Sequence, residues 1–238
     1  MPGPSLLEHI ASEPARAALL LDVDGVLAPI VPIPADAAVP EETRAELRRL
    51  VGRYGLVACV SGRAGDDAAR VVGLPELTYV GEHGLELAPE AAEWAVRLHA
   101  FALTVDWDDV EPKPLTVTFH YRRAADPDAA RVELDAVAAR AEAEGFVARF
   151  GRMVLELRPP VRADKGTAVR ALLERSGLGR ALYAGDDTTD LDAFAALDGV
   201  ELAVRVAVSS AESPQELREA ADVIVDGPAE LLALLRRL

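Results

Sequence analysis

The stretch Leu19-Leu20-Leu21-Asp22-Val23-Asp24-Gly25-Val26-Leu27 places two carboxylates directly after a run of apolar residues. Residues 17–21 are apolar without alternation, which predicts a strand buried on both faces. Asp22 and Asp24 therefore follow the carboxyl end of that strand, where open α/β sheets bind their ligands. Two neighbouring carboxylates need a positive partner there, and an oxygen-rich site of this kind suits Mg²⁺.

The four residues from Asp22 to Gly25 also fit two other structures. An EF-hand calcium loop begins in the same way, but it requires further oxygen ligands and a late glutamate, and here Val26, Leu27 and Ala28 follow. A plain turn built from aspartate and glycine needs no ligand at all. This stretch alone leaves the turn and the catalytic site open.

Composition limits the class of protein. The 238 residues, 50% of them hydrophobic, suffice for one large domain or for a core with a smaller insert. The formal net charge of -15 argues against nucleic acid and a polybasic membrane surface as partners. Cys59 is the only cysteine, which predicts a buried thiol and no disulfide framework. No signal peptide or membrane-length apolar stretch is visible, so we expect a cytoplasmic protein.

Lysine is almost absent from the chain. Of the 25 Lys and Arg residues, only Lys113 and Lys165 are lysines. An ammonium is a compact point charge and a guanidinium is a planar fork, so the two are not interchangeable. A codon bias accounts for the excess of arginine, but the two retained lysines are candidate site residues.

Apolar runs alternate with amphipathic segments at both ends of the chain, which predicts βαβ units and a parallel sheet. The expected strands cover residues 17–21, 56–60, 78–80, 181–184, 202–208 and 223–225. In the middle of the chain, residues 115–121 alternate between apolar and polar, as in a half-exposed strand of an antiparallel sheet. We therefore expect an α/β fold, with a Rossmann-like parallel-sheet core at 1–84 and 160–238 and an inserted α+β cap at 85–159.

Polar groups follow three of the expected core strands, and one more begins a helix. They are Asp22 with Asp24, Ser61, Asp186 with Asp187 and Asp190, and Lys165. A carboxylate can act as a nucleophile, and its neighbour can transfer protons. A hydroxyl and an ammonium can hold phosphate oxygens, while a metal ion offsets the repulsion between two anions. These groups together supply what phosphoryl transfer needs.

The order of these motifs resembles that of the haloacid dehalogenase superfamily of phosphatases. The resemblance implies that Asp22 is the phosphorylated nucleophile and that Asp24 is the general acid and then the base. It also implies that Ser61 and Lys165 hold the phosphate. The implied Mg²⁺ ligands are Asp22, the Asp24 carbonyl and Asp186, with Asp187 or Asp190 in support.

Longer motifs resemble the trehalose-6-phosphate phosphatase family. They include Gly81-Glu82-His83-Gly84, Val110-Glu111-Pro112-Lys113, His120-Tyr121-Arg122 and Gly185-Asp186-Asp187-Thr188-Thr189-Asp190. The resemblance implies Mg²⁺-dependent hydrolysis of trehalose 6-phosphate to trehalose and phosphate through an aspartyl-phosphate, in company with a trehalose-6-phosphate synthase. The implied substrate-binding residues are Gly62, Arg63 and His83 in the core and Glu111, Lys113, Arg122, Arg152 and Glu156 in the cap.

The chain departs from the family pattern at Val26, Pro114 and Thr116, and Pro114 can alter the cap loop. Two other functions stay open. One is hydrolysis of another sugar or polyol phosphate, such as sucrose 6-phosphate or mannosyl-3-phosphoglycerate. The other is a catalytically silent sugar-phosphate-binding regulatory subunit. His83 also fits a core histidine, and Glu111 with Lys113 fits a solvated pair.

Overall fold

The computed structural model describes residues 5–151, 153–210 and 213–238. Contacts within the chain divide it into two compact units. We call Met1–Gly84 with Ala163–Leu238 the core unit and Leu85–Arg162 the cap unit.

A six-stranded parallel sheet forms the centre of the core unit. In spatial order its strands are β10 (Val223–Asp226), β9 (Leu202–Ser209), β8 (Arg180–Gly185), β1 (Ala17–Leu21), β2 (Leu56–Val60) and β3 (Thr78–Val80). β1 lies between β8 and β2, where Leu20 is opposite Tyr183 and Ala58. Every residue of β1 is buried, as the unbroken apolar run predicted, and so is Cys59 on β2.

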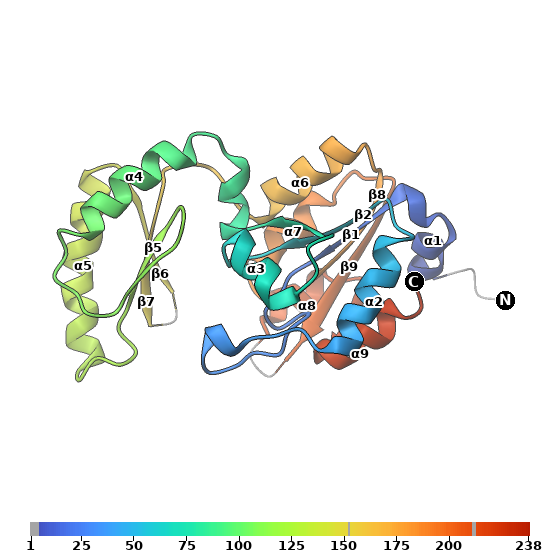
Figure 1. The fold of residues 1–238 in the computed structure, drawn as a ribbon, viewed down its shortest axis with the longest axis horizontal. Helices are drawn as coiled ribbons and strands as arrows, with labels where there is room; N and C mark the ends of the chain where they lie inside the picture. Colours follow the sequence, from blue (N-terminus) through green and yellow to red (C-terminus); the bar gives the residue numbers. More distant parts are fainter. Residues whose placement is uncertain (1–4, 152, 211–212) are drawn as a thin grey trace. The chain divides into compact units, whose positions relative to one another are not determined.

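Helices cover both faces of this sheet (Figure 1). One face packs against α1 (Leu6–Ser12), α2 (Glu41–Val51), α3 (Gly65–Val72) and α9 (Gly227–Leu235). The other carries α6 (Lys165–Ser176), α7 (Asp190–Ala196) and α8 (Gln215–Ala220). Short 3₁₀ segments lie at Pro14–Arg16, Pro34–Asp36 and Glu82–Leu87. The predicted α/β core with a parallel sheet is thereby confirmed.

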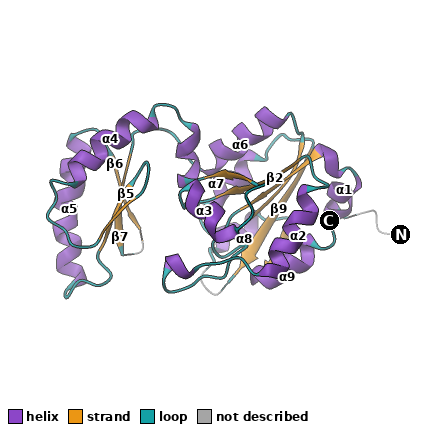
Figure 2. Cartoon of the chain, in the orientation of Figure 1, coloured by secondary structure: helices purple, strands orange, loops and turns teal. Residues whose placement is uncertain are grey.

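The cap unit contains a four-stranded antiparallel sheet with two long helices, as Figure 2 shows. The strand order is β4 (Val110–Pro112), β5 (Val117–His120), β7 (Val154–Arg158) and β6 (Val147–Gly151). The helices are α4 (Ala91–Ala102) and α5 (Pro127–Ala143). Val117, Phe119, Leu155 and Leu157 are buried in one cluster with Leu134 and other residues of these helices. The antiparallel sheet agrees with the alternation in the sequence.

The polar face of the cap sheet differs from the expected half-exposed strand. Thr116 and Thr118 lie on the opposite face of β5 from Val117 and Phe119, yet they are only 1% and 5% exposed. The prediction of exposure was therefore wrong at these two residues. Glu156, the neighbour of Thr118 on β7, is itself largely buried, with 20% of its side chain exposed.

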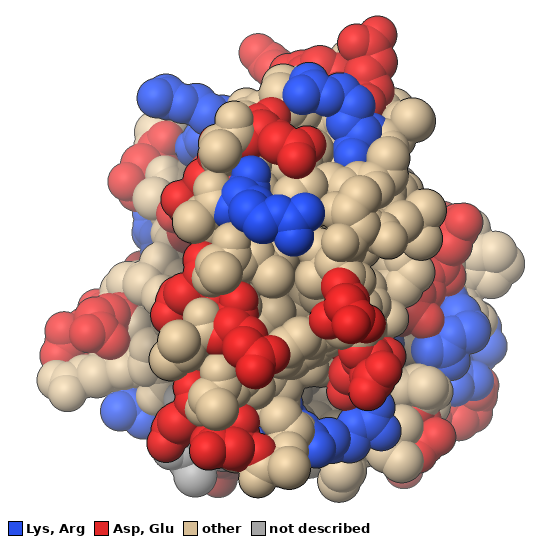
Figure 3. Space-filling view, turned by 90° about the vertical axis from the view of Figure 1, so that its left-hand side faces the viewer, with Lys and Arg blue, Asp and Glu red and all other residues tan. Residues whose placement is uncertain are grey.

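The surface of the protein mixes charges of both signs. On the face shown in Figure 3, acidic and basic side chains are interspersed. Arg131 and Asp135 form an ion pair one turn apart on α5. Within the residues that the structure describes, no helix combines the length and the apolar character needed to cross a membrane.

Candidate active site

Asp22 lies at the point where β1 ends. Its backbone N–H donates to the Ala184 carbonyl at 3.0 Å, so the ladder to β8 continues for one residue beyond the strand. The Asp22 side chain is buried, and its Oδ1 accepts a hydrogen bond from the Val23 N–H at 2.7 Å. Register and local hydrogen bonding together fix this carboxylate at the carboxyl edge of the parallel sheet.

Gly25 allows the chain to turn directly beside this carboxylate. Its φ of 75° lies in the left-handed region that favours glycine, and its N–H donates to the Ala28 carbonyl at 2.8 Å. A Cβ at this position would lie 2.1 Å from Oδ2 of Asp186. Both conformation and space therefore require glycine, and the missing side chain lets Asp186 approach the turn.

Lys165 supplies the positive partner that the buried carboxylates need. It is the first residue of α6, which begins after a capping box formed by Asp164 and Thr167. The side chain is 2% exposed, and Nζ donates to Asp22 Oδ2 and to Asp190 Oδ1, both at 2.6 Å. An ammonium has three N–H groups, so one donor remains for a ligand.

Asp190 connects several parts of the site. Its Oδ1 accepts hydrogen bonds from Lys165 Nζ and from the Tyr183 hydroxyl at 2.7 Å. Its Oδ2 accepts the backbone N–H groups of Asp186 and Asp187, both at 2.9 Å. A carboxylate offers about four lone-pair positions, and protein donors already use four here. Asp190 therefore holds the ammonium and the loop after β8 in place.

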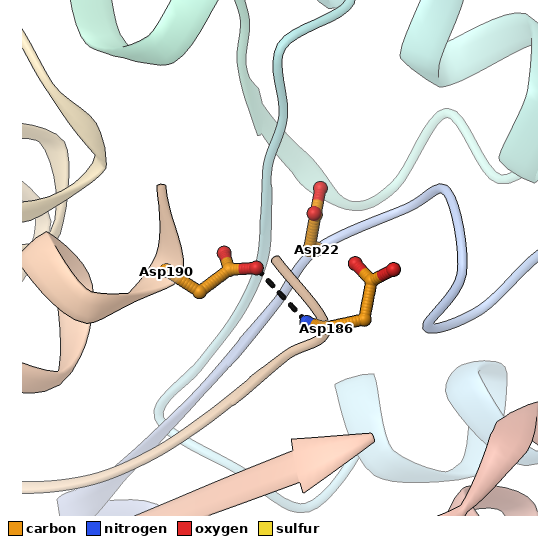
Figure 4. Close-up of side chains that lie close together, drawn as sticks. All are labelled: Asp22, Asp186 and Asp190. Atoms are coloured by element: carbon orange, nitrogen blue, oxygen red, sulfur yellow. Dashed lines mark hydrogen bonds between the residues drawn. The ribbon is translucent and has the colours of Figure 1, made fainter. Parts of the chain in front are cut away.

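Asp22, Asp186 and Asp190 form a group in which one oxygen of each lies within 4.8 Å of the others (Figure 4). Burial raises the pKa of Asp186 to about 8, and the charges of Asp22 and Asp190 add to this effect. Burial also raises the pKa of Asp22, despite the opposing attraction of Lys165. Lys165 pairs with two of these three carboxylates, Asp22 and Asp190, so a divalent cation would relieve the remaining repulsion.

Asp24 takes part in a different set of contacts. Arg63 donates from Nε to Oδ2 of Asp24 at 2.6 Å and from a terminal nitrogen to Oδ1 at 2.8 Å. The same guanidinium donates to Asp67 at 2.7 Å and to the Pro34 carbonyl at 3.0 Å. The Asp24 hydrogen bonds are the largest cause of the raised pKa of Arg63. Most of the five guanidinium N–H groups are thus committed within the core unit.

Ser61 and Gly62 form a tight loop against the segment that follows β3. The Ser61 carbonyl accepts the His83 N–H at 2.9 Å, and a Cβ on Gly62 would lie 2.7 Å from the His83 ring. Ser61 is 1% exposed, and its hydroxyl accepts the Arg63 N–H at 3.2 Å. Glu82 and His83 both have positive φ angles, 49° and 55°. Such strain in non-glycine residues is typical of functional sites.

The cap unit places several of the expected sugar-binding side chains on the polar face of its sheet. Lys113 Nζ lies 4.0 Å from Glu156 Oε1, and Glu111 Oε2 lies 2.8 Å from His120 Nε2. Register puts Glu111 opposite Thr118, and Thr118 opposite Glu156.

The other two expected sugar-binding residues of the cap are Arg122 and Arg152. Arg122 is exposed in the loop after β5, while Arg152 lies outside the described residues.

Two features of the site were absent from the sequence-based prediction. Tyr183 lies within an apolar strand and looks like a packing residue, so no sequence signal marked its hydrogen bond to Asp190. Arg63 is an expected substrate-binding residue, and the sequence did not predict that its side chain also pairs with Asp24 and Asp67. Of these two contacts, the one with Asp67 was foreseeable because Asp67 follows Arg63 by four residues. The contact with Asp24, which is distant in sequence, was not.

Comparison with known proteins relates both units to a single family. The model of the family described as trehalose-phosphatase matches residues 20–110 and 108–226. A trehalose 6-phosphate phosphatase from Zea mays is 31% identical over 261 residues, which cover 96% of this chain and 71% of that protein.

The solved structure of a trehalose-6-phosphate phosphatase C-terminal domain from C. albicans superposes with a TM-score of 0.72 and 24% identity, covering 97% of this chain and 94% of that one. A haloacid dehalogenase-like hydrolase from Bacteroides thetaiotaomicron shares the fold with a TM-score of 0.61 and 16% identity, covering 93% of this chain and 99% of that one.

Proposed function

Because the chain belongs to the trehalose-phosphatase family, we propose that it hydrolyses trehalose 6-phosphate to trehalose and phosphate. The observation that carries this proposal is the buried contact of Lys165 with both Asp22 and Asp190. This contact places the Asp22 carboxylate, at the edge of the sheet, beside an ammonium that has one N–H group left for a ligand. A phosphate ester needs such a pair for attack and for charge neutralisation.

In the proposed reaction, an Asp22 oxygen attacks phosphorus, and the bond from phosphorus to the sugar oxygen breaks. Asp24, as general acid, gives its proton to that oxygen, so trehalose leaves as the alcohol. The Asp24 carboxylate then takes a proton from water, whose oxygen attacks phosphorus and releases Asp22 and phosphate. Lys165 and Ser61 hold the phosphate oxygens throughout. In the free protein both Asp24 oxygens accept hydrogen bonds from Arg63, so Asp24 has to release one of these bonds before it carries the proton.

The donor set fits Mg²⁺, which prefers carboxylate, carbonyl and water oxygens. Asp22 and Asp186 would hold the ion with the Asp24 carbonyl, while Asp190 and Asp187 would support them from behind. Asp190 suits this supporting position because four protein donors already occupy its oxygens. A bound Mg²⁺ would offset the negative charge of the phosphate and of its attacking carboxylate.

The pKa directions at the site predict how Mg²⁺ changes stability with pH. Asp22 and Asp186 have raised pKa values in the folded protein, against 3.8 when unfolded. Their stability contribution is therefore present at low pH and is lost as pH rises from about 4 to about 8, because the unfolded chain then binds fewer protons. Mg²⁺ binds the ionised carboxylates. We expect it to raise the melting temperature more at pH 8 than at pH 6.

Thermal unfolding in Mg²⁺ and in EDTA at both pH values measures this difference. The variant Asp186→Asn is expected to lose most of the Mg²⁺-dependent increase. An increase of equal size at both pH values, or one that survives in Asp186→Asn, would contradict the proposed ion site.

We propose that the cap unit binds the sugar through Glu111, Lys113 and Glu156. Carboxylates accept hydrogen bonds from sugar hydroxyls, and an ammonium donates to them. Arg122 and Arg152 stay candidates from the family resemblance, as does His83 in the core unit. A synthase that forms trehalose 6-phosphate is the proposed source of the substrate.

A phosphate-release screen tests this function directly. The substrates are trehalose 6-phosphate, sucrose 6-phosphate, mannosyl-3-phosphoglycerate and an aryl phosphate, each with Mg²⁺ and with EDTA. We expect the highest kcat/KM with trehalose 6-phosphate in Mg²⁺ and no release in EDTA. A higher kcat/KM with another sugar phosphate would identify that compound as the preferred substrate instead. Binding of trehalose 6-phosphate without any release would indicate a regulatory subunit instead.

A further inference from the structure

Thr118 carries a buried hydroxyl that has no hydrogen-bond partner among the described residues. The residue is 5% exposed and lies in the middle of β5. A buried polar group without a partner carries a desolvation cost, so such groups call for a physical explanation. Thr116, two residues earlier on the same face, has an unpartnered hydroxyl as well. The cap sheet therefore holds two uncompensated hydroxyls on its polar face.

The strand register places Thr118 in the centre of a row of charged residues. Glu111 of β4 is its neighbour on one side and Glu156 of β7 on the other, and Arg149 of β6 follows Glu156. Directly opposite residues on neighbouring strands have their Cβ atoms about 5 Å apart. A ligand that bridges the two glutamates would thus pass over Thr118.

The chemistry of this row selects a polyhydroxylated ligand. Carboxylates only accept hydrogen bonds, an ammonium only donates them, and a threonine hydroxyl does both. A sugar hydroxyl also donates and accepts, so it can satisfy Thr118 and an adjacent glutamate at once. We propose that the Thr118 hydroxyl binds a hydroxyl group of the substrate's sugar and contributes to specificity. This inference rests on the proposed function and adds a contact to it.

The ion pair of Glu156, the neighbour of Thr118 on β7, is loose enough for a ligand to enter beside Thr118. Lys113 and Glu156 are 23% and 20% exposed, and their charged atoms are 4.0 Å apart, which is beyond hydrogen-bonding distance. An ion pair of this kind contributes little to stability, and both side chains are long and flexible. A sugar can therefore separate them and exchange their mutual contact for hydrogen bonds to its own hydroxyls. Thr118 then gains the partner that the described residues of the free protein do not provide.

The test is the substitution Thr118→Val, which keeps the shape and the β-branching but removes the hydroxyl. The measured quantity is kcat/KM for trehalose 6-phosphate divided by kcat/KM for an aryl phosphate. We expect this ratio to fall about two- to tenfold, which corresponds to the loss of one hydrogen bond. We expect the loss to arise from KM, and the melting temperature to stay unchanged or to rise, because an unpartnered hydroxyl has been removed. Thr118→Ser should restore the ratio.

A matched control is Thr104→Val, also in the cap unit. The Thr104 hydroxyl donates to the Phe101 carbonyl at 2.7 Å and accepts from Arg140, so it is already engaged. This variant should lower the melting temperature and leave the ratio at the wild-type value. It shows how a purely structural hydroxyl behaves.

The outcomes separate the inference from the function on which it rests. If wild-type protein prefers another sugar phosphate, that compound replaces trehalose 6-phosphate in the ratio, and only the proposed substrate has failed. If wild type hydrolyses trehalose 6-phosphate but Thr118→Val keeps the wild-type ratio, the Thr118 contact does not exist. A lower melting temperature with an unchanged KM would likewise show a structural role only. Failure of wild type to hydrolyse any sugar phosphate overturns both.

Discussion

Replacing Asp22 by asparagine is expected to lower kcat by roughly a thousandfold or more, with both trehalose 6-phosphate and an aryl phosphate. The amide keeps the shape of the side chain but is a poor nucleophile. The fold should survive, because the substitution removes one charge from a group of three close carboxylates and leaves Asp190 paired with Lys165. Steady-state phosphate release and thermal unfolding measure the two effects.

The control for this variant is Asp198→Asn, which removes an equal charge from an exposed position. It should keep wild-type turnover, so that a loss in Asp22→Asn reports the site and not the net charge. Near-normal phosphate release by Asp22→Asn would rule out covalent attack by this residue.

Replacing Lys165 by methionine is expected to reduce both activity and stability. Asp22 and Asp190 would then be buried without their positive partner, and breaking a buried pair in this way costs about 3–5 kcal/mol of unfolding free energy. Turnover should fall by roughly a hundredfold or more with any phosphate ester, because the lost donor is worth more in the transition state. Denaturant unfolding and phosphate release, both at about pH 7, measure the two effects.

The only other lysine provides a matched comparison for stability. Lys113→Met removes an ammonium that is 23% exposed and 4.0 Å from its nearest carboxylate oxygen, so we expect less than about 1 kcal/mol of change. Equal stability losses in the two variants would show that the Lys165 contacts in the core contribute nothing special. Lys165→Arg adds a second check. We expect it to lower turnover with any phosphate ester, because a planar guanidinium does not replace the compact ammonium at a buried site.

The central strands of the core were predictable from the sequence because β1 and β8 are buried along their whole length and β2 nearly so. The apolar runs at 17–21 and 56–60 gave β1 and β2 with their observed bounds, and β3, which is only partly buried, was also predicted at Thr78–Val80. The group of Asp22, Lys165 and Asp186 was also foreseeable, because all three follow strand ends or begin a helix that the parallel order brings together.

The cap was harder to predict in detail. β4 spans only Val110–Pro112 and includes a proline, while β6, Val147–Gly151, is only partly buried, so neither has a clear alternation. The partners of Arg63 and of Asp190 depend on which side chains meet across the fold. Tyr183 looks like an apolar strand residue, and its hydrogen bond to Asp190, seven residues later on α7, has no sequence signal. Side-chain pairings of this kind leave no periodic trace in the sequence.

The burial of Cys59 has a practical consequence for measuring motion in this protein. The thiol is fully enclosed within β2, and burial raises its pKa, so little reactive thiolate forms at neutral pH. Because it is the only cysteine in the chain, new cysteines placed at exposed positions would be the sole targets for thiol-directed dyes or spin labels. One label in each unit would then report the distance between them in solution, with and without substrate, in an otherwise native background.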